Sequence, residues 1–250
     1  MTRSSLAVLC HNDSRGELGL GPPLPYFLAA LICTFLESVR SFDQLAQEPF
    51  FRHGQWLLQK AVHAEYRWAA YTAPKVFIGI VGGAFLLLFL ASFSDRCRLR
   101  LQVWRKPSLL IACSIIFVPL TVAILKTFSG VYSPVDMLPY GGTRPHTGLL
   151  EQLWVYGATS GGRSFPAGHA SGGFALMALC RLPLRRPWKR RLFVFGILAG
   201  WSMGFYQMAR GEHFLSHTLT TMFLSLGIMT LLDRCIADSG QLLKFFTKRK

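Results

Sequence analysis

Charged residues are scarce in this chain of 250 residues. Asp, Glu, Lys and Arg make up 16% of it, whereas 51% of the residues are hydrophobic. A soluble domain of this length needs more polar surface than that to cover its core. The composition therefore excludes an ordinary soluble fold and favours a protein that lies in a lipid bilayer.

Acidic residues are the scarcer of the two charged classes, with 12 Asp and Glu against 27 Lys and Arg and a net charge of +15. An excess of this size can indicate a protein that binds nucleic acid. Here the basic residues lie in short segments next to apolar runs, where anionic lipid headgroups are the nearer partner. We therefore expect the bilayer, and no nucleic acid, as a partner.

The sequence also lacks an internal repeat, a low-complexity tract and any sign of a second domain. We interpret residues 1–250 as a single membrane-embedded domain. Met1 to Gly21 is polar and has no apolar centre like that of a cleavable signal peptide, so the first apolar segment is expected to insert as an anchor. No cysteine lies in a segment assigned below to the outside, and no disulfide is expected.

Six apolar segments contain no charged residue, and they predict an all-α, polytopic integral membrane protein with six transmembrane helices. They run over residues 22–36, 76–93, 109–125, 170–180, 192–209 and 218–232. Several are shorter than the roughly 20 residues that cross the hydrocarbon core, so they must extend into their flanks. The fourth is the shortest and is rich in Gly and Ala, which suit close helix packing.

The basic residues predict the orientation of these helices, because Lys and Arg resist translocation. With a cytoplasmic N-terminus, 18 of the 27 Lys and Arg fall on the cytoplasmic side. We therefore expect both termini on the cytoplasmic side. Residues 40–75, 126–167 and 207–217 then lie on the outside.

The first of these outside segments, residues 40–75, mixes aromatic and charged residues in "FFRHGQWLLQKAVHAEYRWAAY". This pattern favours an extracytoplasmic, interfacial amphipathic helix or helix pair. A loop packed on the helix bundle explains the same pattern equally well, and both interpretations stay open at this stage.

The outside segments after residue 125 bring cations and imidazoles to one side of the membrane. The loop of residues 126–167 is rich in Gly, Pro, Ser and Thr, which is typical of functional loops, and its aromatic residues argue against disorder. The cations are Lys126, Arg144, Arg163 and Arg210, and the histidines are His146, His169, His213 and His217. Cations bind phosphate through charge-assisted hydrogen bonds, and imidazoles attack or transfer protons near neutral pH.

These loops hold no cluster of carboxylates, the ligands that Mg²⁺ and Mn²⁺ prefer. We therefore predict phosphoryl chemistry with no metal and no other cofactor. Zn²⁺ bound by histidines alone stays an alternative.

Three short motifs resemble the signatures of the type 2 phosphatidic acid phosphatases, in a divergent bacterial membrane form. "SFPAGHASGGF" resembles the second signature, Pro-Ser-Gly-His, and "RGEHFLSH" resembles the third, in which a His lies six residues after an Arg and four before an Asp. Lys126 and Arg144-Pro145 resemble the two ends of the first signature. The resemblance covers residues 76–232, which form the motif-bearing core.

The sequence departs from these signatures in each motif. Seventeen residues separate Lys126 from Arg144, whereas the family has six. Ala167 replaces the Ser of the second motif. Gln207 lies six residues before His213, at the family's Arg position, while Arg210 lies three before it, and His217 replaces the Asp.

The resemblance implies a catalytic role for three histidines. His213 would attack phosphorus to form a phosphohistidine, His169 would protonate the leaving oxygen, and His217, Glu212 or Asp136 would orient His213 in place of the family's Asp.

The resemblance also implies a set of phosphate-binding groups. Lys126 and Arg210 would hold the phosphate, with Arg144 or Arg163 as further candidates. In place of the missing serine, a hydroxyl of Ser164 or Ser171, or the N–H of Gly168, would donate to the phosphate.

The function that follows is a phosphatase for a membrane lipid phosphate or pyrophosphate, with its active site at the periplasmic face. A phosphatase for soluble phosphate esters and a transporter or scramblase-like protein without catalysis are the alternatives. The aromatic outside loop favours a lipid substrate. The near absence of ionisable residues inside the spans argues against transport.

Overall fold

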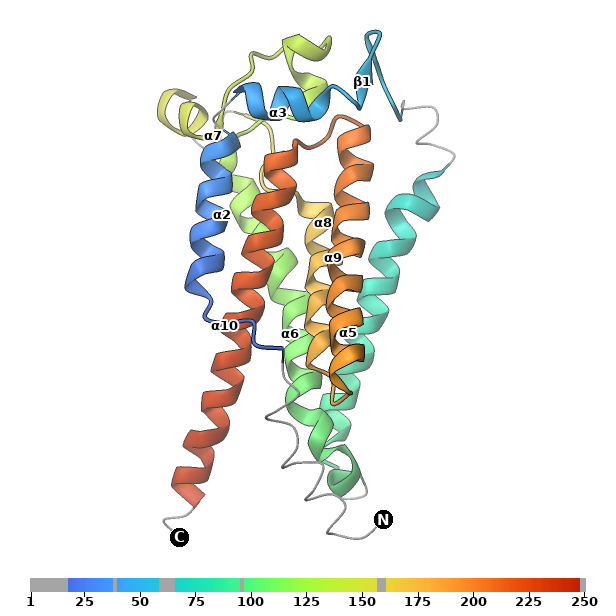
Figure 1. Cartoon of the computed structure of the whole chain (residues 1–250), viewed down its shortest axis with the longest axis vertical. Coiled ribbons are helices and arrows are strands. Elements are labelled where there is room, and N and C mark those ends of the chain that lie inside the picture. The colour runs from blue at the N-terminus through green and yellow to red at the C-terminus, as the bar shows by residue number, and fades with distance from the viewer. Residues whose placement is uncertain (1–17, 38–39, 59–65, 95–96, 157–160, 248–250) are drawn as a thin grey trace.

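Long helices run side by side and form an elongated bundle in the computed structural model (Figure 1). The structure describes residues 18–37, 40–58, 66–94, 97–156 and 161–247. The long elements are α2 (Leu24–Glu37), α5 (Ala73–Ala91), α6 (Arg98–Ser129), α8 (Gly168–Ala175) continued by the 3₁₀ helix η6 (Leu176–Arg181), α9 (Arg186–Ala209) and α10 (Leu215–Thr247).

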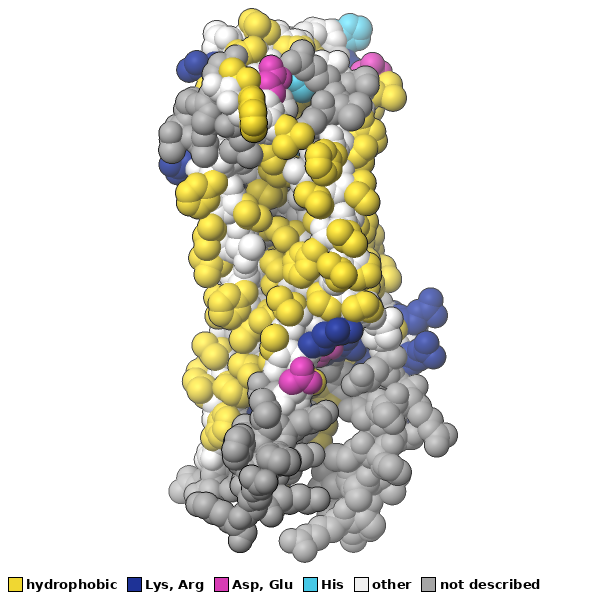
Figure 2. Space-filling model, turned by 90° about the vertical axis from the view of Figure 1, so that its left-hand side faces the viewer, with side chains coloured by type: hydrophobic (Ala, Val, Ile, Leu, Met, Phe, Trp, Pro, Cys, Tyr) yellow, Lys and Arg dark blue, Asp and Glu magenta, His cyan; other side chains and the backbone are white. Residues whose placement is uncertain are grey.

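Each of the six apolar segments predicted from the sequence is helical. Among the described residues, four helices are able to cross a membrane by length and composition: Trp68–Ala91, Leu99–Asp136, Arg186–Ala209 and Leu215–Asp238. The other two, α2 with 14 residues and α8 with η6, are shorter than this. Figure 2 shows one face of the molecule, with hydrophobic side chains across its middle and most of the visible basic side chains below them.

The Gly- and Ala-rich fourth segment lies at the centre of the bundle, where α8 packs against α6, α9 and α10. Phe174 is completely buried in the hydrophobic core. Close approach to α9 requires glycine, because a Cβ on Gly173 would lie 2.6 Å from the Cα of Gly200. The segment is weakly hydrophobic because protein surrounds it, so small side chains matter more there than apolar ones.

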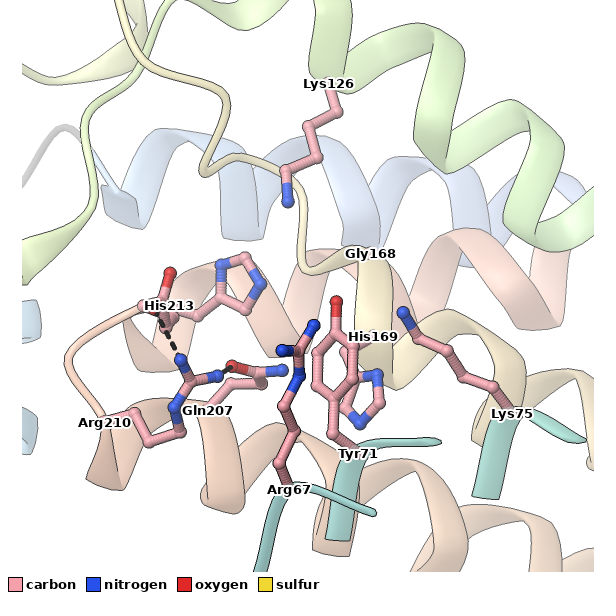
Figure 3. Close-up of a pocket in the computed structure, with 10 residues that line it drawn as sticks. Arg67, Tyr71, Lys75, Lys126, Gly168, His169, Gln207, Arg210 and His213 are labelled. Carbon is pink, nitrogen blue, oxygen red and sulfur yellow. Dashed lines mark hydrogen bonds and ion pairs between the residues drawn. The ribbon is translucent and has the colours of Figure 1, made fainter. Parts of the chain in front are cut away.

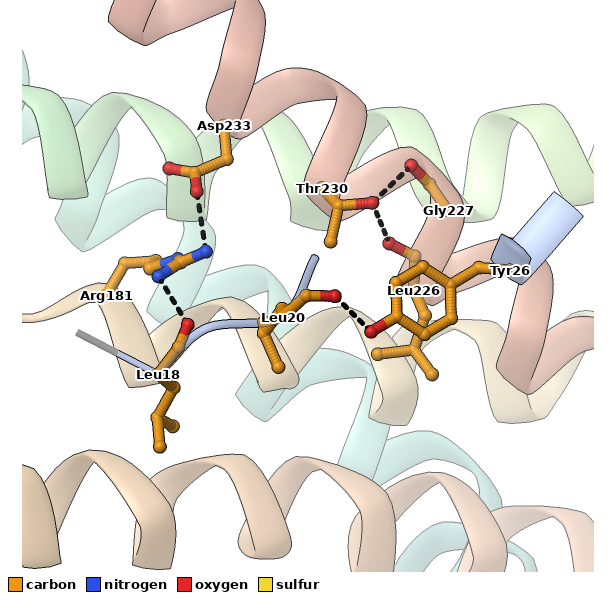
Figure 4. A network of polar contacts seen from close by, with 8 residues as sticks. All are labelled: Leu18, Leu20, Tyr26, Arg181, Leu226, Gly227, Thr230 and Asp233. Carbon is orange, nitrogen blue, oxygen red and sulfur yellow. Dashed lines mark hydrogen bonds and ion pairs between the residues drawn. The ribbon is translucent and has the colours of Figure 1, made fainter. Parts of the chain in front are cut away.

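A polar network closes the end of the bundle near the first described residues (Figure 4). Arg181 forms an ion pair with Asp233 of α10 at 2.6 Å and donates to the backbone oxygen of Leu18 at 3.1 Å. The hydroxyl of Tyr26 donates to the backbone oxygen of Leu20. These contacts tie the start of the described chain and α10 to the end of η6.

Short elements cover the opposite end of the bundle. They are α3 (Arg40–Gln47), the strands β1 (Phe51–Arg52) and β2 (Gln55–Trp56), the π-helical turns η2 (Trp68–Thr72) and η5 (Gln152–Tyr156), the 3₁₀ turns η3 (Pro134–Asp136) and η4 (Leu138–Tyr140), and α7 (Leu149–Glu151). From Gly130 onward, the described residues of the loop 126–167 thus form only short turns, as its composition predicts.

Helix α3 packs on the bundle through buried polar side chains. The backbone N–H of Ser216, in the first turn of α10, donates to Asp43 Oδ1 at 3.0 Å, and its hydroxyl donates to Oδ2. The side-chain amide of Gln47 donates to the backbone oxygen of Met208 at 2.9 Å. Asp43 therefore caps the N–H groups at the start of α10.

The prediction of an amphipathic helical loop over residues 40–75 needs correction. Residues 51–56 form an antiparallel hairpin with Phe51 opposite Trp56, so this part is not helical and the chain is not strictly all-α. Gly54, with a φ of 75°, supplies the left-handed conformation that the turn requires. The polar residues of α3 contact α9 and α10, which agrees with the alternative of a segment packed on the bundle. Residues 59–65 lie outside the described part of the chain.

The contact between α8 and α9 predicts a strong effect of one added methyl group. We expect Gly173→Ala to lower the free energy of unfolding by about 1–3 kcal/mol, because its Cβ meets the backbone of α9. Thermal unfolding in detergent measures the effect. Gly83→Ala in α5 is the matched control, since no atom lies within 4 Å of its added Cβ. Equal melting temperatures for the two variants would contradict the packing argument.

The buried carboxyl of α3 predicts a dependence of stability on pH. Burial raises the pKa of Asp43 from 3.8 to about 6, and the hydrogen bonds from Ser216 oppose this shift only in part. Between pH 3.8 and about 6, the Asp43 carboxyl binds its proton more tightly in the folded protein than in the unfolded chain. The contribution of Asp43 to the free energy of unfolding therefore falls as the pH rises through this range, and it stays lower above pH 6.

Asp43→Asn keeps an acceptor and a polar partner for Ser216 without the charge. We expect this variant to melt above the wild type at pH 7 and the difference to narrow as the pH is lowered to about 4.5. Melting curves in detergent between these pH values measure it, and Glu48→Gln at an exposed acid of the same end serves as control. A difference that is the same at every pH would be inconsistent with a buried, titrating Asp43.

Candidate active site

A cavity of about 500 Å³ opens at the end of the bundle that α3 covers. Four parts of the chain line it: η2 with the start of α5, the end of α6, the start of α8, and the end of α9 with the turn after it. The lining residues are Arg67, Tyr71, Lys75, Lys126, Gly168, His169, Gln207, Arg210, Glu212 and His213 (Figure 3). Four of them are Lys or Arg, and Glu212 is the one acid.

The loop before α8 places the Ser164 hydroxyl between two histidines. Its Oγ lies 3.2 Å from Nδ1 of His213 and 3.4 Å from Nδ1 of His217, and it donates to the backbone oxygen of Glu212 at 2.5 Å. The backbone N–H of Ser164 donates to the oxygen of Val131 at 2.9 Å. Ser164 therefore joins the second outside loop to the third.

Two glycines allow this loop to lie against the segment after α6. A Cβ on Gly161 would lie 1.7 Å from the backbone oxygen of Gly130, and one on Gly162 would lie 2.6 Å from that of Val131. Only residues without a side chain fit at such distances. The glycines of "GGRSFPAGH" thus set the position of Ser164.

The contacts of Ser164 assign the protons of the neighbouring imidazoles. A serine hydroxyl has a single proton, and Ser164 donates its proton to the backbone oxygen of Glu212. The Ser164 oxygen then accepts from Nδ1–H of His213 and of His217. With the proton on Nδ1, Nε2 of His213 keeps a lone pair, which is the form of imidazole that attacks phosphorus.

Burial is the largest influence on the charge of His213, followed by nearby Lys126. Both lower the pKa of His213 well below its ordinary value of 6.5. The imidazole is therefore neutral at neutral pH and nucleophilic.

His217 lies behind His213 and does not line the cavity. It is completely buried, its ring centroid is 5.8 Å from that of His213, and Phe165 packs edge-on against it at 5.1 Å. The structure connects the two histidines through the Ser164 oxygen.

Arg210 lines the cavity with its guanidinium held from two sides. It donates to the Gln207 side chain at 2.9 Å and forms an ion pair with Glu212 at 3.0 Å. Gln207 occupies the position at which the resembling family has its Arg. In this chain the guanidinium comes from three residues later and lies beside that position.

Lys126 and His169 complete the motif residues of the cavity. Lys126 lies in the last turn of α6, and a Cβ on Gly168 would lie 3.7 Å from its Nζ, so the amine lies against the first turn of α8. His169 is buried, and neither ring nitrogen makes a hydrogen bond within the described part of the chain. The ring of Tyr71 stacks on it at 4.6 Å with an interplanar angle of 9°.

The two predicted phosphate-binding arginines Arg144 and Arg163 lie outside this lining, as do the candidate hydroxyls of Ser164 and Ser171. Arg144 is exposed, its backbone pairs with residues 136–138, and its guanidinium lies 5.3 Å from the centre of the Tyr132 ring. Arg163 is exposed as well. Ser171 donates to the backbone oxygen of Gly168 within α8, which occupies its hydroxyl proton.

Three lining residues were not selected from the sequence. Arg67, Tyr71 and Lys75 follow one another at intervals of four, which puts them on one side of a helix that enters α5. That spacing is visible in the sequence, within a segment interpreted there only as an interfacial loop. What the sequence does not show is that this side faces His169.

Comparison with known proteins identifies the family of the chain. Residues 107–241 match the model of the PAP2 superfamily, and this range contains Lys126, His169, Arg210 and His213. No curated protein and no solved structure matches the chain. The family match covers more than half of the chain and confirms the resemblance to the type 2 phosphatidic acid phosphatases. The chain therefore belongs to the PAP2 superfamily, whose members are phosphatases that act on phosphate esters.

Proposed function

We propose that the protein is a metal-independent phosphatase that removes a phosphate from a membrane lipid phosphate or diphosphate through a phosphohistidine at His213. One observation carries the proposal: a neutral imidazole, fixed through Nδ1 by Ser164, shares a cavity with a second histidine and with Lys126 and Arg210. That set can hold a phosphate, attack it and release its alcohol.

Lys126 and Arg210 bind the phosphate oxygens in this proposal. Their positive charges lie near His213, where negative charge gathers on the transferred phosphoryl group. The backbone N–H of Gly168, the first residue of α8, is a further donor. Arg144 and Arg163 line no part of the cavity, and we assign them no direct contact with the phosphate.

Nε2 of His213 attacks phosphorus, and the bond between phosphorus and the leaving oxygen breaks. His169 gives a proton to that oxygen, and the negative charge of the bound substrate favours the protonated imidazole that this step needs. His169 then takes a proton from water, which attacks the phosphohistidine. The P–N bond breaks and inorganic phosphate leaves.

Ser164 takes the orienting role of the family's Asp, and not the phosphate-binding role expected from the sequence. The Ser164 hydroxyl donates its proton to the backbone oxygen of Glu212, so Ser164 has no proton left to donate to the substrate. His217 donates to the same Ser164 oxygen and helps to hold it in place. Glu212 is paired with Arg210 and Asp136 is exposed, so neither carboxylate is the partner of His213.

The surroundings of the cavity favour a lipid substrate. Tyr66 and Trp68, beside Arg67, are 60% and 72% exposed, as aromatic residues at the headgroup layer are. We infer that α2 and the α8–η6 helix cross the bilayer together with the four longer helices. The six spans then place the cavity at the periplasmic face of a bacterial inner membrane and both termini in the cytoplasm.

The roles of the two adjacent histidines are separable. We expect His213→Ala to lower phosphate release from a lipid phosphate at least ~10³-fold, with no acid-labile phosphoenzyme, because the attacking nitrogen is gone. His217→Ala should be slower than wild type and still form the phosphoenzyme, since Ser164 still orients His213. Rapid-quench labelling with ³²P-substrate in EDTA measures both.

His53→Ala, at an exposed histidine of the hairpin, is the control and should match the wild type. Phosphate trapped on His217 in the wild-type enzyme, or a phosphoenzyme in His213→Ala, would refute the assignment. Activity lost in EDTA and restored by Zn²⁺ would refute the metal-independent mechanism.

The proposed topology predicts opposite accessibilities for the two ends of the bundle. In a variant without native cysteines, a Cys at the exposed Thr143 should react with an impermeant maleimide in intact cells. A Cys at the exposed Arg186 should react only after the membrane is opened. The reverse pattern would place the cavity in the cytoplasm.

A further inference from the structure

The turn between α9 and α10 carries two residues of the candidate site, Arg210 and His213. In the proposed reaction both must keep a defined position, because a displacement of about 1 Å at a reacting group can slow a reaction ~100-fold. The middle of the turn is held by η3, where the backbone N–H of Val135 donates to the oxygen of Gly211 at 2.9 Å. Residues 40–58 hold both of its ends, and Figure 1 shows α3 lying across this end of the bundle.

Gln47 and Leu58 hold the end of the turn that leaves α9. The side-chain amide of Gln47 donates to the backbone oxygen of Met208 at 2.9 Å, and the backbone N–H of Leu58 donates to the oxygen of Ala209 at 3.0 Å. Gln47 is completely buried, so water does not compete for its hydrogen bond. These contacts fix the backbone directly before Arg210.

The hairpin packs on the next residue of the turn, Gly211. A Cβ at this position would lie 2.5 Å from the indole ring of Trp56, and the φ of Gly211 is 73°, so both the contact and the backbone favour glycine. The rings of Phe51 and Tyr140 pack on the same indole at centroid distances of 4.9 and 5.3 Å. The turn therefore lies against an aromatic cluster that includes both strands of the hairpin.

Asp43 holds the end of the turn that enters α10. Its carboxylate is completely buried, accepts from the backbone N–H of Ser216 at 3.0 Å and also accepts from the Ser216 hydroxyl. An acid at this place satisfies an N–H that has no partner within the helix. Ser216 lies three residues after His213 and directly before His217, so this contact fixes where the helix starts relative to both imidazoles.

These contacts act on the backbone of the turn and not on the substrate. Among the described residues that line the cavity, none comes from residues 40–58. The hydrogen bond from Nδ1 of His213 to Ser164 sets the rotation of the ring. The position of Nε2 depends in addition on the Cα from which the ring extends, and residues 40–58 hold the backbone on both sides of that Cα.

We propose that Asp43 is a positioning residue for the nucleophile: through Ser216 it holds the backbone of His213 so that Nε2 reaches the phosphorus. This inference rests on the proposed function and adds to it a residue that lies outside the range 107–241 of the family match. Helix α3 thus belongs to the catalytic end of the molecule without touching the substrate.

The two ends of the turn have different kinetic roles in this proposal. Loss of the Asp43 contact displaces the attacking imidazole, so it slows the chemical step and lowers kcat. Loss of the Gln47 contact displaces the backbone of Arg210, which binds the phosphate before and during the attack, so it raises KM as well.

The test measures kcat and KM of the purified full-length enzyme on dioleoyl phosphatidic acid and on farnesyl diphosphate, below the melting temperature of every variant. Asp43→Ala should lower kcat by about 10- to 100-fold on both substrates, because the displaced atom is the nucleophile, and change KM by less than about 3-fold. Asp43→Asn keeps an oxygen that accepts from Ser216, and its kcat should stay within about 3-fold of the wild type. Gln47→Ala should raise KM at least ~3-fold.

Ser92→Ala is the matched control. It removes a buried hydroxyl that accepts from Arg105 at 3.0 Å, at the opposite end of the bundle, and should change neither kcat nor KM. Ser216→Ala added to Asp43→Ala should lower kcat no further than Asp43→Ala alone, because both substitutions remove the same contact.

Hydrogen exchange measured by mass spectrometry reports on the contact without using catalysis. Peptides that cover residues 208–217 should exchange faster in Asp43→Ala than in the wild type and in Asp43→Asn. A wild-type kcat in Asp43→Ala would overturn the positioning role, and so would an equal loss of kcat in Asp43→Asn. Faster exchange in Asp43→Ala, together with no phosphate release by the wild type that depends on His213, would instead refute the proposed phosphatase function and reduce Asp43 to a structural cap of α10.

Discussion

The close packing of α8 in the centre of the bundle positions the active end of the molecule. A helix that approaches α9 to the point where Gly173 meets Gly200 cannot slide or tilt without backbone clashes. Its first residues, Gly168 and His169, are therefore held at a defined depth. The loop that leads into it is anchored in turn by glycines against residues 130–131, so Ser164 reaches the turn between α9 and α10.

In the proposed topology, the bilayer explains why the candidate catalytic residues lie at helix ends. Within hydrocarbon the backbone must satisfy its own hydrogen bonds, which leaves the spans helical and apolar. Polar groups that meet in space then have to come from the loops and the last helical turns on one side. Lys126 in the last turn of α6, His169 at the start of α8 and Arg210 after α9 follow this rule, although 83 residues of sequence separate the first from the last.

In the proposed mechanism, neighbours in space compensate for the substitutions in the family's motifs. Arg210, which Gln207 contacts, supplies the guanidinium that the family has at the position of Gln207. The hydroxyl of Ser164, with His217 as its second donor, takes the place of the carboxylate that orients the family's nucleophile. A neutral hydroxyl stabilises an imidazolium less than a carboxylate does. This agrees with the lowered pKa of His213, which is buried next to Lys126 and therefore neutral.

The sequence alone determined the six helical segments, because each is a run of apolar residues bounded by charged ones. It also determined the principal candidate site residues, Lys126, His169, Arg210 and His213, because short motifs keep their local spacing. It did not determine the hairpin at residues 51–56, since aromatic and charged residues alternate there in a way that suits a helix and a short strand pair alike. Only the tertiary structure decided that Arg144 lies outside the cavity while Arg67 and Lys75 lie inside it. The reason is physical: which loop residues converge depends on how far each helix extends and which way its last turn faces, and these follow from helix contacts between residues distant in the chain.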